Sequence, residues 1–214
     1  MDYDYKTYEN LSVSYSAELV GGGEKYGQDY LRLLPLQVGK VCRAFEWCAG
    51  PGFIGFSMLA RGLCDTLCLA DVNEEAADAC LDTIERNGLQ DRVDVYLSDG
   101  LKDIPKSESW DLVVGNPPHS GTDEQLAWGP ELIYMDVGWK IHRDFYNNVG
   151  QFLAPDSNVI IQENRDRSCM DDFEPMMTKG GLQAGKTSNC PISEHIYYAW
   201  SALKPESENT LGTR

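Results

Sequence analysis

The sequence lacks any apolar run of the roughly 18–20 residues that a membrane-spanning helix requires. Its first residues, MDYDYKTYENLSVSYSAEL, are polar and acidic, so they do not resemble the apolar core of a secretory signal peptide. We therefore expect a protein without a membrane contact and with a cytoplasmic location.

Basic residues are also scarce. Lys and Arg together number 18 against 34 Asp and Glu, which gives a net charge of −16, and none lies between Ser107 and Trp139. A strongly negative surface repels phosphate backbones, so nucleic acid is disfavoured as a partner. The acidic stretch is either an ordinary solvated surface or a substrate entrance that disfavours anions.

Cysteine spacing gives no sign of a disulfide framework or a metal site. The seven cysteines are an odd number and are scattered; Cys64 and Cys68 lie four apart without a second Cys or His pair nearby. This pattern is typical of small buried residues in a reducing compartment, and we predict no metal. The chain shows no internal repeat, so we expect one domain over residues 1–204, with a flexible tail at 205–214.

What the sequence does contain is an alternation of strand-like and helix-like segments from residue 41 to about 163. We expect strands at 41–47, 66–71, 93–99, 110–115 and 158–163, and helices at 53–62, 73–88, around 137–149, and at 170–181. Such alternation predicts a parallel sheet with helices on both faces. Two further strands, near 182–187 and 195–202, follow without an intervening helix and predict an antiparallel hairpin.

The segment 73–88 has the clearest helical pattern. Asn73 is a good N-cap and Gly88 a good C-terminal residue. Its apolar residues recur at helical spacing, which predicts a buried face of Ala77, Cys80, Leu81 and Ile84.

Polar residues stand at the ends of four successive predicted strands. The segment EWCAGPGFIG places G-x-G-x-x-G between a strand and a helix, where glycine lets a ligand approach the backbone. An ordinary strand-to-helix turn that binds no ligand could have the same glycine spacing. Glu46, Asp71, Asp99 and Asn116 follow at the same sheet edge. These acceptors suit an amino group, a ribose and an adenine, whereas phosphates would need donors.

These motifs resemble those of the class I S-adenosylmethionine-dependent methyltransferases, in the group with an Asn-Pro-Pro-aromatic motif after the fourth strand. The resemblance implies a Rossmann-like α/β fold with seven strands in the order 3-2-1-4-5-7-6, strand 7 antiparallel. It implies S-adenosylmethionine as cofactor, S-adenosylhomocysteine as product, and an N-terminal segment, 1–38, that closes over the cofactor. The implied cofactor residues are Tyr26, Glu46, Cys48, Ala49, Gly50, Gly52, Phe53, Asp71, Val72, Asp99, Gly100 and Asn116; Cys48 stands where glycine is commonest.

The segment GNPPH, ending at His119, matches the substrate motif of this group. The Asn116 side-chain carbonyl and the Pro117 backbone carbonyl can accept the two hydrogens of an –NH₂ group, and both prolines, Pro117 and Pro118, fix the backbone φ angle. His119 takes the usual aromatic position, where it could stack on a planar substrate or accept the departing proton. His142 and His195 are interpreted as packing or surface residues.

The sequence thus predicts an N-methyltransferase acting on a planar amino or amide nitrogen, most simply a protein glutamine or a small metabolite. One alternative is a nucleic-acid base (adenine N6-type) methyltransferase, which the acidity disfavours. Another is an NAD-dependent oxidoreductase, although a pyrophosphate would meet an acidic edge there. A third is a non-catalytic subunit that binds cofactor. The oligomeric state is not predicted.

Overall fold

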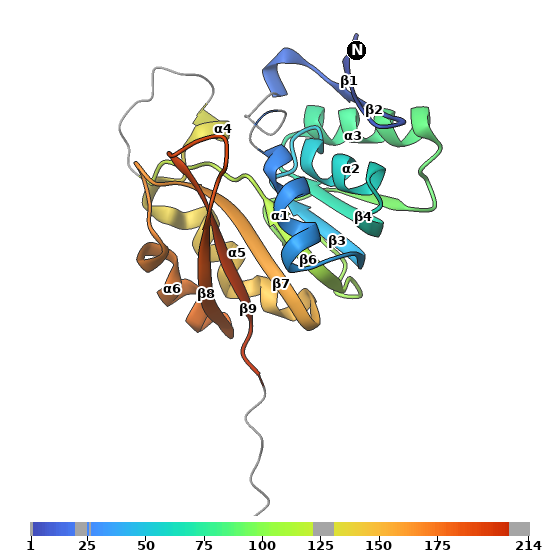
Figure 1. The fold of residues 1–214 in the computed structure, drawn as a ribbon. Coiled ribbons are helices and arrows are strands. Elements are labelled where there is room, and N and C mark those ends of the chain that lie inside the picture. The colour runs from blue at the N-terminus through green and yellow to red at the C-terminus, as the bar shows by residue number, and fades with distance from the viewer. Residues whose placement is uncertain (1, 20–24, 26, 122–130, 206–214) are drawn as a thin grey trace, which may run out of the picture.

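The computed structural model describes residues 2–19, 25, 27–121 and 131–205. Seven strands form the central sheet: β3 (Val41–Trp47), β4 (Cys64–Asp71), β5 (Val93–Leu97), β6 (Trp110–Gly115), β7 (Leu153–Asn164), β8 (Leu182–Asn189) and β9 (Ile196–Leu203). Their order is β5-β4-β3-β6-β7-β9-β8, and β9 is antiparallel to both neighbours (Figure 1). Renumbered along the chain, this is the predicted order 3-2-1-4-5-7-6, so the predicted fold class is confirmed.

Helices cover both faces of this sheet (Figure 1). They are α1 (Tyr30–Gln37), α2 (Phe53–Ala60), α3 (Glu74–Asn87), the short α4 (Glu131–Tyr134), α5 (Lys140–Asn148) and α6 (Met170–Lys179), with 3₁₀ turns η1 (Ala17–Leu19), η2 (Gly27–Asp29), η3 (Val137–Trp139) and η4 (Val149–Phe152). Successive strand residues point to opposite faces. Ala44 packs in the cluster with α1, α2 and α3, whereas Phe45 packs in the cluster with α5 and α6. The central strands are therefore apolar at nearly every position.

Helix α3 has the caps that the sequence predicts, with one residue misplaced. The Asn73 side chain accepts a hydrogen bond from Glu75 N at 3.0 Å, and Gly88 ends the helix in the left-handed conformation. Ala77, Cys80 and Ile84 are buried, as predicted. The prediction that Leu81 is buried was wrong, because it is 52% exposed. The buried face turns toward Ala76, Ala79 and Thr83 instead.

A two-stranded hairpin, which no sequence pattern predicted, precedes the main sheet. Strands β1 (Asp4–Tyr8) and β2 (Leu11–Tyr15) pair antiparallel and rest on α3. Ser14 N donates to Thr83 Oγ1 at 2.9 Å, and Asn87 Nδ2 donates to the Ser12 carbonyl at 2.9 Å. Only β2 buries side chains, so most of the segment stays polar and lacks a strong strand signal.

Within the described ranges, no helix is both long and apolar enough to cross a bilayer. All seven cysteines are free thiols. The described residues contain no cluster of three or more His, Cys, Asp or Glu side chains that could hold a metal ion.

Candidate active site

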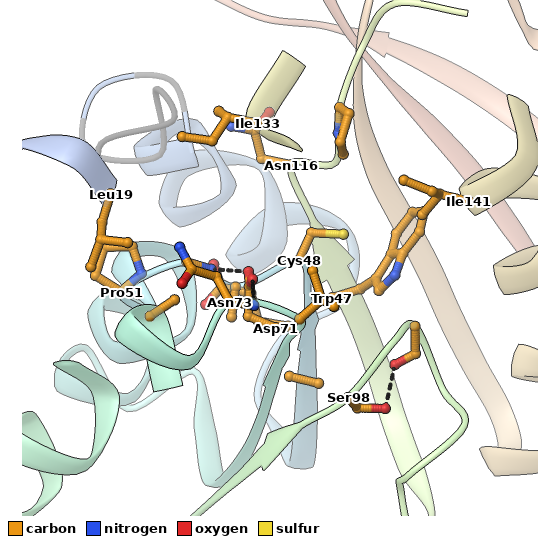
Figure 2. A pocket seen from close by; sticks show the side chains of 18 of the residues that line it. Leu19, Trp47, Cys48, Pro51, Asp71, Asn73, Ser98, Asn116, Ile133 and Ile141 are labelled. Atoms are coloured by element: carbon orange, nitrogen blue, oxygen red, sulfur yellow. Dashed lines mark hydrogen bonds between the residues drawn. The ribbon is translucent and has the colours of Figure 1, made fainter. Parts of the chain in front are cut away.

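The carboxyl ends of β3, β4, β5 and β6 open into one pocket (Figure 2). The residues predicted from sequence that line it are Glu46, Cys48, Ala49, Gly50, Phe53, Asp71, Val72, Asp99, Gly100, Asn116 and Pro118. The described residues Gly52, Pro117 and His119 are not among its lining residues, and Tyr26 lies outside the described part of the chain. The four strand ends singled out in the sequence therefore meet at one site.

The loop between β3 and α2 turns through three residues with left-handed backbone conformation. Their φ values are 51° at Cys48, 52° at Gly50 and 77° at Gly52. Such angles suit glycine, which explains why glycine is the expected residue at the Cys48 position and why cysteine is strained there. A Cβ on Gly52 would lie 2.7 Å from Phe56, so this glycine serves close packing of the loop on α2 rather than the pocket wall.

Glu46 is a buried acid at the base of this loop. Its Oε2 accepts a hydrogen bond from Gly55 N at 2.6 Å, and the side chain is 2% exposed. Burial raises the pKa of Glu46 to about 8, despite the opposing backbone hydrogen bonds from Gly55 and Ile54. No described lysine, arginine or histidine forms an ion pair with it. A ligand cation beside this carboxyl would supply the missing partner.

Asp71, at the end of β4, ties the glycine loop to the start of α3. Its Oδ2 accepts from Gly50 N at 2.7 Å and its Oδ1 accepts from Asn73 N at 2.9 Å. Burial raises the pKa of Asp71, while these hydrogen bonds lower it. The carboxylate has four lone pairs in total, so it keeps capacity for a hydroxyl donor from the pocket. This geometry suits the two hydroxyls of a ribose.

The segment after β5 lines the pocket differently from the prediction. Ser98 is buried, and its hydroxyl donates to the Gly100 carbonyl at 3.0 Å and accepts from Asp103 N at 3.1 Å. These bonds fix the turn that carries Asp99. The Asp99 carboxylate is mostly exposed and forms an ion pair with Lys102. An adenine amino group at Asp99 would therefore compete with the Lys102 ammonium.

Asn116 projects from the end of β6 into the same pocket (Figure 2). Its Oδ1 accepts hydrogen bonds from Gln162 Nε2 at 2.6 Å and from His119 Nε2 at 2.8 Å. Gly115, just before it, has no space for a side chain, because a Cβ there would lie 2.8 Å from the Trp47 carbonyl. The close approach of β3 and β6 thus sets where the amide group stands.

Several residues that line the pocket were not predicted from the sequence. Leu19 comes from η1, and Ile133 and Ile141 come from α4 and α5 (Figure 2). Trp47 lies at the end of β3, where an aromatic residue is expected in the core; it stacks on Phe145 with ring centroids 3.9 Å apart. Apolar residues of this kind carry no sequence signal for a ligand, because the core uses the same residue types.

A family model described as methyltransferase small domain matches residues 32–135. The chain is 23% identical over 184 residues to a ribosomal protein uL3 glutamine methyltransferase of Neisseria gonorrhoeae, covering 81% of this chain and 58% of that protein. It is 26% identical over 136 residues to a bifunctional methyltransferase of Rickettsia felis, covering 56% of this chain and 24% of that protein. The chain thus spans little more than half of one relative and about a quarter of the other.

Solved structures share the fold. The T. thermophilus 16S rRNA N2 G1207 methyltransferase, in complex with AdoMet and guanosine, superimposes with a TM-score of 0.65 at 15% identity, covering 95% of this chain and 50% of that one. A ribosomal protein L11 methylase of Lactobacillus delbrueckii gives a TM-score of 0.61 at 14% identity, covering 85% and 80%.

S-adenosylmethionine is the cofactor that the methyltransferase family uses. The pocket fits it, because it combines a buried acid without a cation partner, Glu46, with free acceptor capacity on Asp71 and apolar walls. Glu46 would hold the methionine ammonium and Asp71 the ribose hydroxyls. These comparisons agree with the resemblance predicted from the motifs: residues 32–135 match the methyltransferase small domain model, and the chain shares the fold of the solved methyltransferase structures.

Proposed function

We propose that this protein transfers a methyl group from S-adenosylmethionine to a planar amino or amide nitrogen. The observation that carries the proposal is the position of Asn116, which shares one pocket with the glycine loop and with Asp71. A bound sulfonium supplies an electrophilic methyl group. The chain's task is then to hold the acceptor nitrogen close to that methyl and in line with it.

The Asn-Pro-Pro segment suits this task. An amide or aniline-like nitrogen is a poor nucleophile, because its lone pair is delocalised over the neighbouring group. Hydrogen bonds from its two N–H groups to Asn116 Oδ1 and to the Pro117 carbonyl would fix the plane of the group. Pro117 and Pro118 restrict the backbone, so the two acceptors are placed in advance. His119 follows directly and lies within hydrogen-bond distance of Asn116.

A protein glutamine is the acceptor that we favour. The N. gonorrhoeae relative is named for glutamine methylation of a ribosomal protein. The described pocket lining contains Glu46, Asp71 and Asp99 and no lysine or arginine, which opposes the binding of a phosphate backbone. A nucleic-acid base is the second candidate, since the T. thermophilus neighbour is named as an rRNA methyltransferase.

A labelled-methyl assay tests the proposal. The protein is incubated with S-adenosylmethionine carrying a labelled methyl group, together with purified ribosomal protein uL3 or with lysate separated into protein, RNA and small molecules. Label on a glutamine of the protein fraction is the expected result, whereas label in RNA would support the second candidate. Asn116→Ala should abolish transfer and keep affinity for S-adenosylhomocysteine within several-fold, because Glu46 and Asp71, which would hold the cofactor, stay in place.

Two results would contradict the proposal. Transfer that survives in Asn116→Ala would show that the amide does not hold the acceptor. Thermal stabilisation by NAD but not by S-adenosylhomocysteine would favour an oxidoreductase.

A further inference from the structure

A series of buried polar contacts runs from Asp136 to Asn116. Asp136 Oδ2 lies 2.6 Å from His142 Nδ1, and His142 Nε2 lies 2.9 Å from Glu163 Oε1. The other oxygen, Glu163 Oε2, is 3.6 Å from His119 Nδ1. His119 Nε2 then reaches Asn116 Oδ1 at 2.8 Å. The start of α5 and the end of β7 are thereby joined to the Asn-Pro-Pro-His segment.

Three members of this series carry charge in the core. Burial alone would lower the pKa of His142, but the Glu163 charge and the hydrogen bonds to both carboxylates raise it to about 9. Burial alone would raise the pKa of Asp136 and of Glu163, but contacts with His142, and for Glu163 also with His119, hold both below their ordinary values. Near neutral pH, one imidazolium thus stands between two carboxylates, and one net negative charge remains.

The other titratable groups packed around Glu163 are neutral near pH 7. Burial raises the pKa of each of them: Cys48 after β3, Tyr30 on α1, Tyr146 on α5 and Tyr197 on β9. His119 Nδ1 lies 3.6 Å from Glu163 Oε2, the carboxylate oxygen that does not bond to His142. The remaining negative charge therefore acts mainly on His119.

His119 Nδ1 and Glu163 Oε2 face each other without a hydrogen bond. Both atoms are buried, and neither has a hydrogen-bond partner among the described residues. Their separation of 3.6 Å is too long for a hydrogen bond. A small rotation of the imidazole toward Glu163 would form that bond and would break the contact between Nε2 and Asn116 Oδ1.

Asn116 Oδ1 already accepts as many hydrogen bonds as a carbonyl oxygen can. Its two lone pairs are taken by Gln162 Nε2 and His119 Nε2. An acceptor N–H that binds Asn116 must displace one of these donors. Gln162 is 1% exposed and lies within β7. His119, in contrast, has Glu163 Oε2 nearby as an alternative hydrogen-bond acceptor. His119 is therefore the donor that leaves.

We propose that Glu163 draws His119 away from Asn116 when the acceptor nitrogen binds, and thereby makes His119 the group that takes the proton released in methyl transfer. This inference rests on the proposed function. In the new position Nδ1–H donates to Glu163 Oε2, and the Nε2 lone pair faces the acceptor nitrogen; the ring exchanges its proton with water to change tautomer. Glu163 is a positioning residue, and His142 and Asp136 hold it in place.

The proton balance of the step is complete. A bond forms between the acceptor nitrogen and the methyl carbon as the bond between that carbon and sulfur breaks. The nitrogen then loses one of its two protons to His119 Nε2. The resulting imidazolium, whose side chain is 22% exposed, releases that proton to water. No further reactant is needed.

Ring-nitrogen NMR of the free protein tests the inference without any methyl acceptor. The chain has three histidines, so a sample with nitrogen-labelled histidine gives three rings to assign. In the free protein, the ring proton of His119 should lie on Nε2, where it is donated to Asn116 Oδ1. In Asn116→Ala the competing oxygen is gone, and the proton should move to Nδ1, facing Glu163.

The double variant Asn116→Ala/Glu163→Gln should return the His119 proton to Nε2, because the glutamine amide donates to Nδ1. Asn116→Ala/Glu194→Gln is the matched control; the Glu194 side chain is 91% exposed, and the proton should stay on Nδ1. A proton that remains on Nε2 in Asn116→Ala, or on Nδ1 in the double variant, overturns the inference. These results do not depend on the identity of the acceptor, so they separate this inference from the proposed function.

Kinetics with an acceptor found by the labelled-methyl assay give a second test. Glu163→Gln should lower kcat about tenfold to a hundredfold, within the contribution of general acid–base catalysis, and leave KM for S-adenosylmethionine unchanged. Glu163→Asp, which keeps the carboxylate, should recover part of the rate. Equal losses in both variants at every pH, together with a lowered melting temperature, would assign Glu163 a structural role alone and overturn the inference.

Discussion

Glu46→Gln is expected to stabilise the free protein at alkaline pH while it weakens cofactor binding. The pKa of Glu46 rises from 4.5 to about 8 because the carboxyl group is buried. Between these values the folded chain keeps its proton and the unfolded chain has lost it. Stability from this group is therefore highest below about pH 4.5, falls as pH rises, and levels off above about pH 8. The difference between the two pKa values corresponds to a loss of about 5 kcal/mol in unfolding free energy at most.

Urea denaturation of both proteins across this pH range measures the effect. Glutamine matches glutamate in shape and can still accept the hydrogen bond from Gly55 N. The difference in unfolding free energy between variant and wild type reports on Glu46 alone, because the other titrating groups are the same in both proteins. Wild type should lose stability relative to Glu46→Gln as pH rises. Stability curves that stay parallel would refute the claim that a buried, protonated Glu46 exists.

Calorimetry links the same group to the cofactor. At pH 7 an acid with a pKa of about 8 is roughly 90% protonated. An ammonium group placed beside Glu46 favours the ionised form, so binding of S-adenosylhomocysteine should release close to one proton in wild type. Titrations in buffers of different ionisation enthalpy measure this number. Glu46→Gln should release none, and an equal release from both proteins would show that the ligand cation lies elsewhere.

Three further predictions follow from single contacts. Asp71→Ala should weaken S-adenosylhomocysteine binding by roughly 1–3 kcal/mol, the cost of unpaired hydroxyls, and unchanged affinity in calorimetry would exclude the ribose contact. Gly55→Ala should destabilise the fold by about 1–3 kcal/mol in urea, because its Cβ would lie 2.8 Å from both Glu46 Oε2 and a Leu67 methyl group; wild-type stability would show that these side chains can move away. Ile84→Ala should cost about 2–5 kcal/mol and Leu81→Ala much less, and equal losses would contradict the assigned face of α3.

Much of the fold follows from local sequence. The alternation of strand and helix, the two caps of α3 and the strand ends at Asp71 and Asn116 all depend on neighbours in the chain, and each is confirmed. The order of the sheet came from the resemblance to a family. The hairpin β1–β2 was missed, since its outer strand is mostly exposed and gives no apolar alternation.

The site was predicted in part for the same reason. Glu46, Asp71 and Asn116 stand at strand ends, and parallel strands bring such ends together whatever the details of packing. The residues Gln162 and Glu163 end the next strand in the same way, and this signal could have been read from the sequence. Only the structure shows that Glu163 meets His142 and His119.

Local sequence predicts most strands and helices of the main sheet, and the polar groups at its edge, because short-range periodicity and backbone preferences decide both. Tertiary structure alone decided that Asp136, His142 and Glu163 form one buried charged series. Glu163 lies 21 residues from His142. Their contact depends on how α5 packs on β7, and no local pattern encodes that packing.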